Sequence, residues 1–153
     1  MMPWYFAYGR NMDVNCLYRR IGKIPPLMCR GILPGYELRF NKTPGPRRGT
    51  GYANIVPAAG KWVEGVLYLL TELDLEQLDT YEGAPTDYRR YLVNVWNVDH
   101  KRWVKAVTYV AVRTDDTLKP PKDYLSEILN SAKVVGLSIE WISVLEKFLE
   151  KAL

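Results

Sequence analysis

Two neighbouring segments with a two-residue repeat constrain the fold of this chain more than any other feature. Residues 91–96 read Tyr-Leu-Val-Asn-Val-Trp, so that every second side chain falls on one face, and the same spacing recurs over residues 104–110. A period of two is that of a β-strand. Asp99 and His100 lie between the segments and favour a turn. The sequence therefore predicts a β-hairpin.

Further strands are expected before this hairpin. Residues 4–8 form an apolar, aromatic run that ends at a glycine, and residues 62–70 are almost continuously apolar. Such runs are typical of buried strands. Residues 27–40 predict a pair of short strands bent at Pro34-Gly35, and residues 53–56 predict another strand. Residues 41–51 hold three glycines, two prolines and three basic residues, which indicates a mobile loop.

Four helices are marked by their capping residues. Asp13 is a suitable N-cap for residues 14–21, and Thr71 with Asp74 forms a capping-box pattern before a helix that runs to about residue 80. Residues 123–135 predict a helix that ends at Gly136, and Ser138 is a suitable N-cap for the last one. Together these elements predict an α+β fold: a strongly curved sheet, mixed or antiparallel, with α-helices packed outside. A small, curved, mixed β-barrel with flanking α-helices is one closed form of such a sheet.

Length and charge agree with an ordinary globular protein. The 153 residues, with a net charge of +4, suit one domain over residues 1–153. No apolar run reaches the roughly 18–20 residues that span a bilayer, and residues 1–8 do not resemble a signal peptide. We therefore expect a cytoplasmic protein without a membrane partner. The basic pairs, such as Arg19-Arg20, are expected to be solvated, and nucleic acid is not an expected partner.

The sequence lacks the side chains that several classes of enzyme need for catalysis. His100 is the only histidine, and all four serines fall in the predicted C-terminal helices. A Ser-His-Asp triad is therefore not expected. Cys16 and Cys29 match neither a CxxC pair nor a zinc knuckle, and their spacing gives no support for a Cys-His pair. We expect no metal, so that any chemistry rests on carboxylates, tyrosines, basic residues or backbone amides.

Two short segments stand out as candidate sites. In residues 8–11 a buried strand opens at Gly9 toward a helix, where backbone N–H groups can approach an anionic ligand. Glu82 is expected just past the predicted helix, next to Gly83 and flanked by Tyr81 and Tyr88. A carboxylate among aromatic rings is partly desolvated, which raises its pKa and suits it to proton transfer. A plain surface glutamate is the alternative.

These segments and others, in order along most of the chain, resemble the γ-glutamylcyclotransferase family, also described as AIG2-like. Tyr5-Phe6-Ala7-Tyr8-Gly9-Arg10-Asn11 is similar to that family's YFAYGSN loop, except that Arg10 replaces the usual serine. Further similar positions are residues 53–57 with Gly60, residues 65–68, Leu78-Asp79, Glu82-Gly83, Tyr88, Pro121, Tyr124, Gly136 and Leu137.

The resemblance implies a small β-barrel enzyme that needs no cofactor and converts a small-molecule γ-glutamyl amino acid or peptide to 5-oxoproline and a free amine. It implies that Glu82 is the general acid/base. It also implies substrate contacts from residues 5–11, Tyr88 and Tyr124. Either a monomer or a homodimer is expected.

Other functions remain open from the sequence. A related cyclotransferase could act on γ-glutamylamines or on γ-glutamyl-acylated intermediates, and a non-catalytic protein of this fold could hold a small metabolite. A third hypothesis is RNA binding by the basic loop at residues 42–48. The Arg10 side chain either points to solvent or pairs with a nearby carboxylate, or it reaches over the pocket and clamps a substrate carboxylate.

Overall fold

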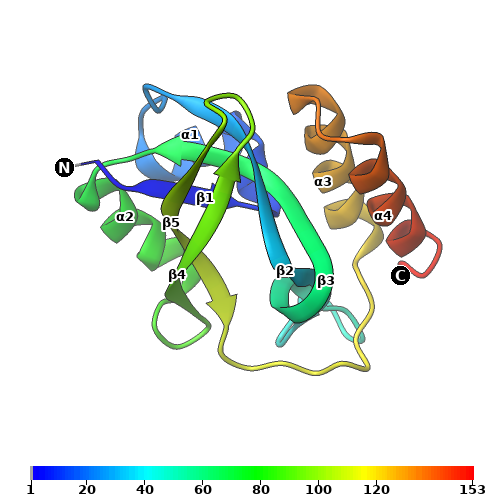
Figure 1. Cartoon of the computed structure of the whole chain (residues 1–153). Coiled ribbons are helices and arrows are strands. Elements are labelled where there is room, and N and C mark those ends of the chain that lie inside the picture. The colour runs from blue at the N-terminus through cyan, green and yellow to red at the C-terminus, as the bar shows by residue number, and fades with distance from the viewer. Residues whose placement is uncertain (1) are drawn as a thin grey trace.

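The computed structural model describes residues 2–153, and its central feature is a closed five-stranded barrel (Figure 1). The strands are β1 (Trp4–Ala7), β2 (Met28–Lys42), β3 (Tyr52–Leu69), β4 (Tyr88–Asn97) and β5 (Arg102–Ala111). They follow the order β1-β3-β2-β4-β5 around the barrel. β1 and β5 run parallel and close it, whereas all other neighbours are antiparallel. The predicted mixed barrel is confirmed.

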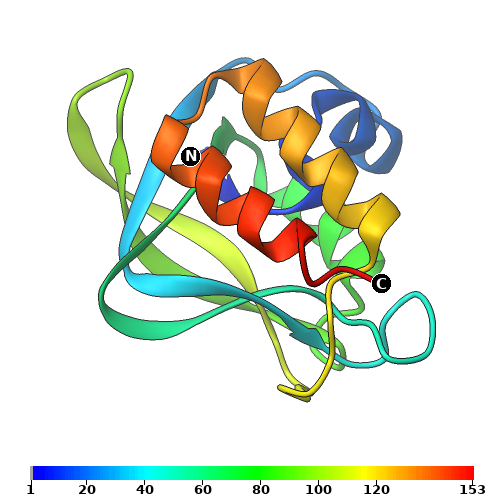
Figure 2. The ribbon, with the colours of Figure 1, turned by 90° about the vertical axis from the view of Figure 1, so that its right-hand side faces the viewer.

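Four α-helices lie outside the barrel. They are α1 (Val14–Ile21), α2 (Glu72–Glu82), α3 (Lys122–Val135) and α4 (Ile139–Leu149). α3 and α4 pack side by side against one flank of the barrel, whereas α1 and α2 lie away from this pair (Figures 1 and 2). None of the helices within residues 2–153 is both long enough and apolar enough to cross a membrane.

The predicted hairpin is formed by β4 and β5, which pair without interruption from Tyr88 opposite Ala111 to Asn97 opposite Arg102. The predicted capping residues are also confirmed. The Asp13 and Ser138 side chains accept hydrogen bonds from the first turns of α1 and α4, and Thr71 with Asp74 forms the reciprocal capping box of α2. Gly136 ends α3 in the left-handed conformation with φ 78°.

Two predictions about strand continuity were wrong. Residues 27–40 do not form two strands, because β2 runs through a bulge between Pro34 and Tyr36 and pairs with β3 on both sides of it. Residues 53–56 and 62–69 likewise belong to one strand, β3, and the predicted Leu70 lies just past its end. Gly35 and Gly60 adopt positive φ values of 83° and 77°, which glycine tolerates without strain. The two strands therefore bend together instead of ending.

The predicted loop at residues 41–51 is shorter than expected. β2 continues through Lys42, which pairs with Tyr52 of β3, so that the connecting loop covers only residues 43–51. Its end is held by a hydrogen bond of 3.0 Å from Gly51 N to Lys119 O. Asn41 and Lys42 are therefore buried, and the Lys42 side chain lies in the interior of the protein.

Candidate active site

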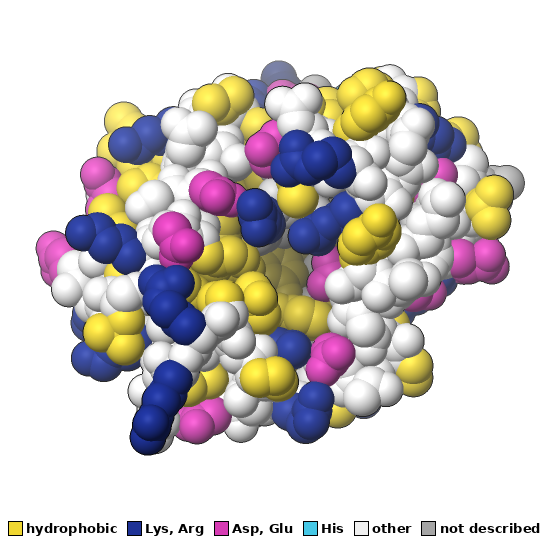
Figure 3. Space-filling view, turned by 180° about the vertical axis from the view of Figure 1, so that it is seen from behind, with side chains coloured by type: hydrophobic (Ala, Val, Ile, Leu, Met, Phe, Trp, Pro, Cys, Tyr) yellow, Lys and Arg dark blue, Asp and Glu magenta, His cyan; other side chains and the backbone are white. Residues whose placement is uncertain are grey.

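A pocket of about 260 Å³ opens beside the end of β1, where segments that are distant in sequence converge. The face seen in Figure 3 is hollowed, with side chains of the hydrophobic class, which here includes tyrosine, in its depth and both basic and acidic side chains around its mouth. The residues that line the pocket are Tyr5, Tyr8, Gly9, Arg10, Asn11, Arg20, Lys42, Tyr52, Ala53, Tyr81, Glu82, Asp87, Tyr88, Thr108, Tyr109 and Tyr124.

Glu82 reaches this pocket because of its position on α2. It is the last residue of the helix, and it shares a face with Leu75 and Leu78, which are completely buried. Spacings of four and seven residues place side chains on the same side of a helix. The face that packs into the core therefore also carries the Glu82 carboxylate inward. The sequence placed Glu82 just past the helix, whereas the helix ends at it.

Gly83 permits the turn that follows. Its φ of 64° is left-handed, and a Cβ at this position would lie only 2.3 Å from an oxygen of the Asp87 side chain. A larger residue would therefore require both strain and displacement of Asp87.

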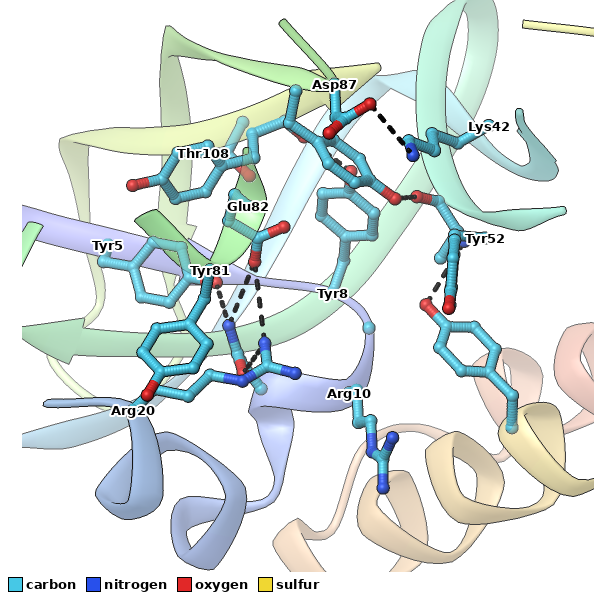
Figure 4. Close-up of a pocket in the computed structure, with 16 residues that line it drawn as sticks. Tyr5, Tyr8, Arg10, Arg20, Lys42, Tyr52, Tyr81, Glu82, Asp87 and Thr108 are labelled. Carbon is cyan, nitrogen blue, oxygen red and sulfur yellow. Dashed lines mark hydrogen bonds and ion pairs between the residues drawn. The ribbon is translucent and has the colours of Figure 1, made fainter. Parts of the chain in front are cut away.

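Asn11 holds the Glu82 carboxylate. Its Nδ2 donates to Glu82 Oε1 at 3.3 Å and to the Tyr5 hydroxyl at 3.0 Å, while its Oδ1 accepts from Arg20 Nη1 at 2.9 Å (Figure 4). The Tyr68 hydroxyl donates to the Asn11 carbonyl at 2.7 Å. With its main-chain carbonyl and both ends of its side-chain amide engaged, Asn11 presents a fixed donor to the carboxylate.

The environment of Glu82 favours its neutral form. Its side chain is 15% exposed. Burial raises the pKa of Glu82, and the opposing effects of Arg20, Lys42 and the Asn11 hydrogen bond do not cancel this increase. Arg20 Nη1 lies 3.8 Å from Glu82 Oε1. A carboxyl group whose pKa is shifted toward neutrality can both accept and return a proton.

Four tyrosines, two of them buried and two partly buried, form much of the remaining wall. Burial raises the pKa of Tyr5, Tyr8, Tyr88 and Tyr124, so their hydroxyls stay neutral. Two of them bracket Ala53: the Tyr88 hydroxyl donates to its carbonyl at 2.7 Å, and the Tyr124 hydroxyl accepts from its N–H at 3.2 Å. These bonds tie β4 and α3 to β3 and keep the wall rigid.

The segment at residues 8–11 also contributes backbone to the pocket. Within residues 2–153, the N–H groups of Arg10 and Asn11 have no hydrogen-bond acceptor in the protein. The Arg10 side chain, in contrast, is directed toward α3, where its Nε lies 2.9 Å from Glu127 Oε2 (Figure 4). Arg10 therefore lines the pocket while its charge is paired with Glu127 on α3.

The structure brings together most, but not all, of the residues expected at the site. Tyr5, Tyr8, Gly9, Arg10, Asn11, Glu82, Tyr88 and Tyr124 line the pocket. Phe6 and Ala7 do not. Phe6 alternates with Tyr5 along β1 and is completely buried in the core, and Ala7 is 2% exposed.

Sequence reasoning missed two cationic residues of the pocket. Arg20 was expected to be a solvated surface charge, but it contacts Asn11 and Glu82. Its position on α1, one turn after the buried Cys16, was the signal that it lies on an inward face. Lys42 was assigned to an exposed basic loop, and its burial removes it from the surface that RNA binding would need. Its only sequence signal was the run of strand-forming residues that precedes it.

The pocket contains no histidine or cysteine, but the structure does pair Cys29 with His100 elsewhere. Cys29 Sγ lies 3.6 Å from His100 Nε2, a contact that the sequence spacing did not suggest. Among residues 2–153, no three His, Cys, Asp or Glu side chains are grouped so that they could hold a metal ion. Metal-independent activity stays a prediction.

The family described as "Gamma-glutamyl cyclotransferase, AIG2-like" matches residues 5–126, which include all residues that line the pocket. The chain belongs to this family. No curated protein sequence matches the chain.

Solved structures share the fold of this family member. A structure titled "Gamma-glutamyl cyclotransferase" has a TM-score of 0.85 at 24% identity, over 95% of this chain and 87% of that one. An uncharacterized protein from Homo sapiens has a TM-score of 0.81 at 25% identity, over 95% and 86% of the two chains. YkqA from Bacillus subtilis has a TM-score of 0.81 at 27% identity, over 99% of this chain and 55% of that one.

Proposed function

We propose that this protein is a γ-glutamylcyclotransferase that converts a γ-glutamyl amino acid or peptide to 5-oxoproline and the free amine. The single observation that carries the proposal is the Glu82 carboxylate, which is buried at the end of α2, faces the pocket and is held by Asn11. Membership of the family supports the same reaction class.

In the proposed reaction, the α-amine of the substrate attacks the γ-carbonyl carbon. Glu82 takes a proton from the α-ammonium group, the new C–N bond closes a five-membered ring, and the C–N bond to the leaving amine breaks as Glu82 returns a proton to its nitrogen. Nucleophile and electrophile belong to one molecule, so that much of the catalysis is the selection of a folded conformation. The rigid tyrosine wall suits that task.

The remaining pocket residues support this proton transfer. The free N–H groups of Arg10 and Asn11 can bind the substrate's α-carboxylate or the oxyanion that develops at the γ-carbonyl. Asn11 and Arg20 act on Glu82 itself: they orient the carboxylate and limit the rise of its pKa. Tyr88 and Tyr124 contribute shape, and their neutral hydroxyls add no charge to the site.

Replacing Glu82 tests the proposal directly. Glu82→Gln keeps the size of the side chain and an oxygen that accepts from Asn11, but cannot carry a proton. We expect 5-oxoproline formation, followed by mass spectrometry, to fall by about 10²–10⁴-fold. Glu76→Gln, an exposed residue of the same helix, is the control. A folded Glu82→Gln protein with near-wild-type turnover would contradict the assignment.

A further inference from the structure

Lys42 is a buried cation without a close partner. Its side chain is only 7% exposed and lines the pocket. The oxygen contacts of Nζ within residues 2–153 are long: 3.5 Å to the Pro44 carbonyl and 3.6 Å to Asp87 Oδ1. An ammonium group normally donates over about 2.7–3.2 Å, and a buried charge is costly unless it is paired. The three Nζ donors are therefore poorly satisfied by the protein alone.

Asp87 is a long-range ion-pair partner of Lys42, and Lys42 shares it with Arg113. Its Oδ1 also accepts from Arg113 Nη2, at the shorter distance of 2.9 Å, and the side chain is 37% exposed. The Lys42 ammonium instead lies 5.6 Å from the ring centres of both Tyr52 and Tyr88. Cation–π contacts stabilise a positive charge without using its hydrogen-bond donors. Lys42 is therefore held in place and remains free to bind an anion.

The other basic side chains of the pocket are already engaged. Arg20 donates to Asn11 and lies beside Glu82, and Arg10 pairs with Glu127. Figure 4 shows Arg20 on one side of the pocket and Lys42 on the other, with Glu82 toward Arg20. A ligand whose reacting amide lies at Glu82 can therefore extend toward Lys42.

We propose that Lys42 binds the carboxylate of the leaving amino acid and so selects γ-glutamyl amino acids over γ-glutamylamines, an inference that rests on the proposed cyclotransferase function. The glutamyl half is common to both kinds of substrate, and we assign its own carboxylate to the N–H groups of Arg10 and Asn11, which have no acceptor within residues 2–153. Only the amino acid leaving group brings a second carboxylate. Lys42 is then a specificity-determining residue.

A matched pair of substrates tests this role. γ-Glutamylalanine and γ-glutamylethylamide differ only in the carboxylate of the leaving group. We expect the wild-type protein to favour γ-glutamylalanine by about tenfold or more in kcat/KM, the range that a hydrogen bond to a charged group supports. Lys42→Met keeps the length of the side chain and removes the charge. It should reduce this preference by at least about tenfold, mainly through a higher KM for γ-glutamylalanine.

The matched control is Lys105→Met, which removes a lysine from the exposed surface of β5 and should leave the preference unchanged. Equal losses for both substrates in Lys42→Met would overturn the proposal, because Lys42 would then act on a group that both share. A wild-type protein without any preference would also overturn it. This second measurement does not depend on the folding of a variant.

Binding separates this inference from the proposed catalysis. Glu82→Gln and the double variant Glu82→Gln/Lys42→Met can be titrated calorimetrically with the same two compounds. Suppose that the wild-type protein forms no 5-oxoproline, that Glu82→Gln binds γ-glutamylalanine more tightly than γ-glutamylethylamide, and that adding Lys42→Met removes this difference. The catalytic proposal then fails, and the carboxylate site at Lys42 stands. If the wild-type protein forms 5-oxoproline but Glu82→Gln binds both compounds equally, the catalytic proposal stands and the proposed role of Lys42 is wrong.

Discussion

Arg10 and Arg20 show how much the partners of a side chain decide its role. Both line the pocket, but the charge of Arg20 is directed at Asn11 and Glu82, whereas that of Arg10 is paired with Glu127 on α3. The Arg10–Glu127 pair is exposed on both sides, at 45% and 55%. Exposed pairs of this kind contribute little, about 0–1 kcal/mol. The serine usual in the family and the arginine found here can therefore present the same backbone to a ligand.

Arg10→Ser should consequently have small and equal effects on the two matched substrates. We expect kcat/KM for γ-glutamylalanine and γ-glutamylethylamide to change by less than about threefold, since the exposed ion pair is weak and the main chain is unaltered. Steady-state kinetics with both substrates measure this. A tenfold loss confined to γ-glutamylalanine would show instead that Arg10 clamps the carboxylate.

At the scale of elements, α2 links a local capping motif to the position of the candidate acid/base. The Asp74 carboxylate accepts from Thr71 N at 2.9 Å, and Thr71 Oγ1 accepts from Asp74 N at 3.1 Å. The Asp74 carboxylate is also 2.8 Å from Lys23 Nζ. The start of the helix is therefore fixed to the segment after α1, and its other end presents Glu82.

Thr71→Ala should destabilise the protein by about 0.5–2 kcal/mol, because it leaves a first-turn N–H of α2 without its side-chain acceptor. Urea denaturation provides the free energy of unfolding. Glu76→Ala, on the exposed face of the same helix, should change it by less than about 0.5 kcal/mol. Equal stabilities of Thr71→Ala and the wild type would mean that the capping box does not stabilise α2.

At the scale of the whole molecule, closing the barrel and packing the helices removes the Glu82 carboxyl group from water. Its pKa is raised above the ordinary value of 4.5, chiefly by burial. Below about pH 4.5 Glu82 is protonated in both the folded and the unfolded chain, and no stability is lost. As the pH rises through the folded-state pKa, the folded protein must ionise a buried group, and its stability decreases relative to that of a neutral side chain.

Glu82→Gln should therefore be at least as stable as the wild type at pH 8, and its advantage should shrink as the pH falls to 4.5. Urea denaturation at several pH values measures the difference. Glu76→Gln is the control, since it makes the same substitution at an exposed position of the same helix. An advantage of Glu82→Gln that grows toward low pH would contradict the raised pKa.

The parts of this protein that follow from the sequence by itself are those with local causes. The two-residue repeat of the hairpin depends only on side-chain alternation, and the caps at Asp13, Thr71 and Ser138 involve residues within three positions of one another. The burial of Glu82 also has a local component, because its spacing from Leu75 and Leu78 is helical. Its role as acid/base stays a prediction based on family resemblance.

Only the tertiary structure decided what depends on distant partners. Gly35 and Gly60 resemble strand ends in sequence, but pairing between β2 and β3 continues across both bends. Lys42 resembles a loop residue, but the two strands carry it into the pocket beside Tyr88 and Asp87. These outcomes are set by hydrogen bonds and charges between segments that are far apart in sequence, and such contacts exist only once the barrel has closed.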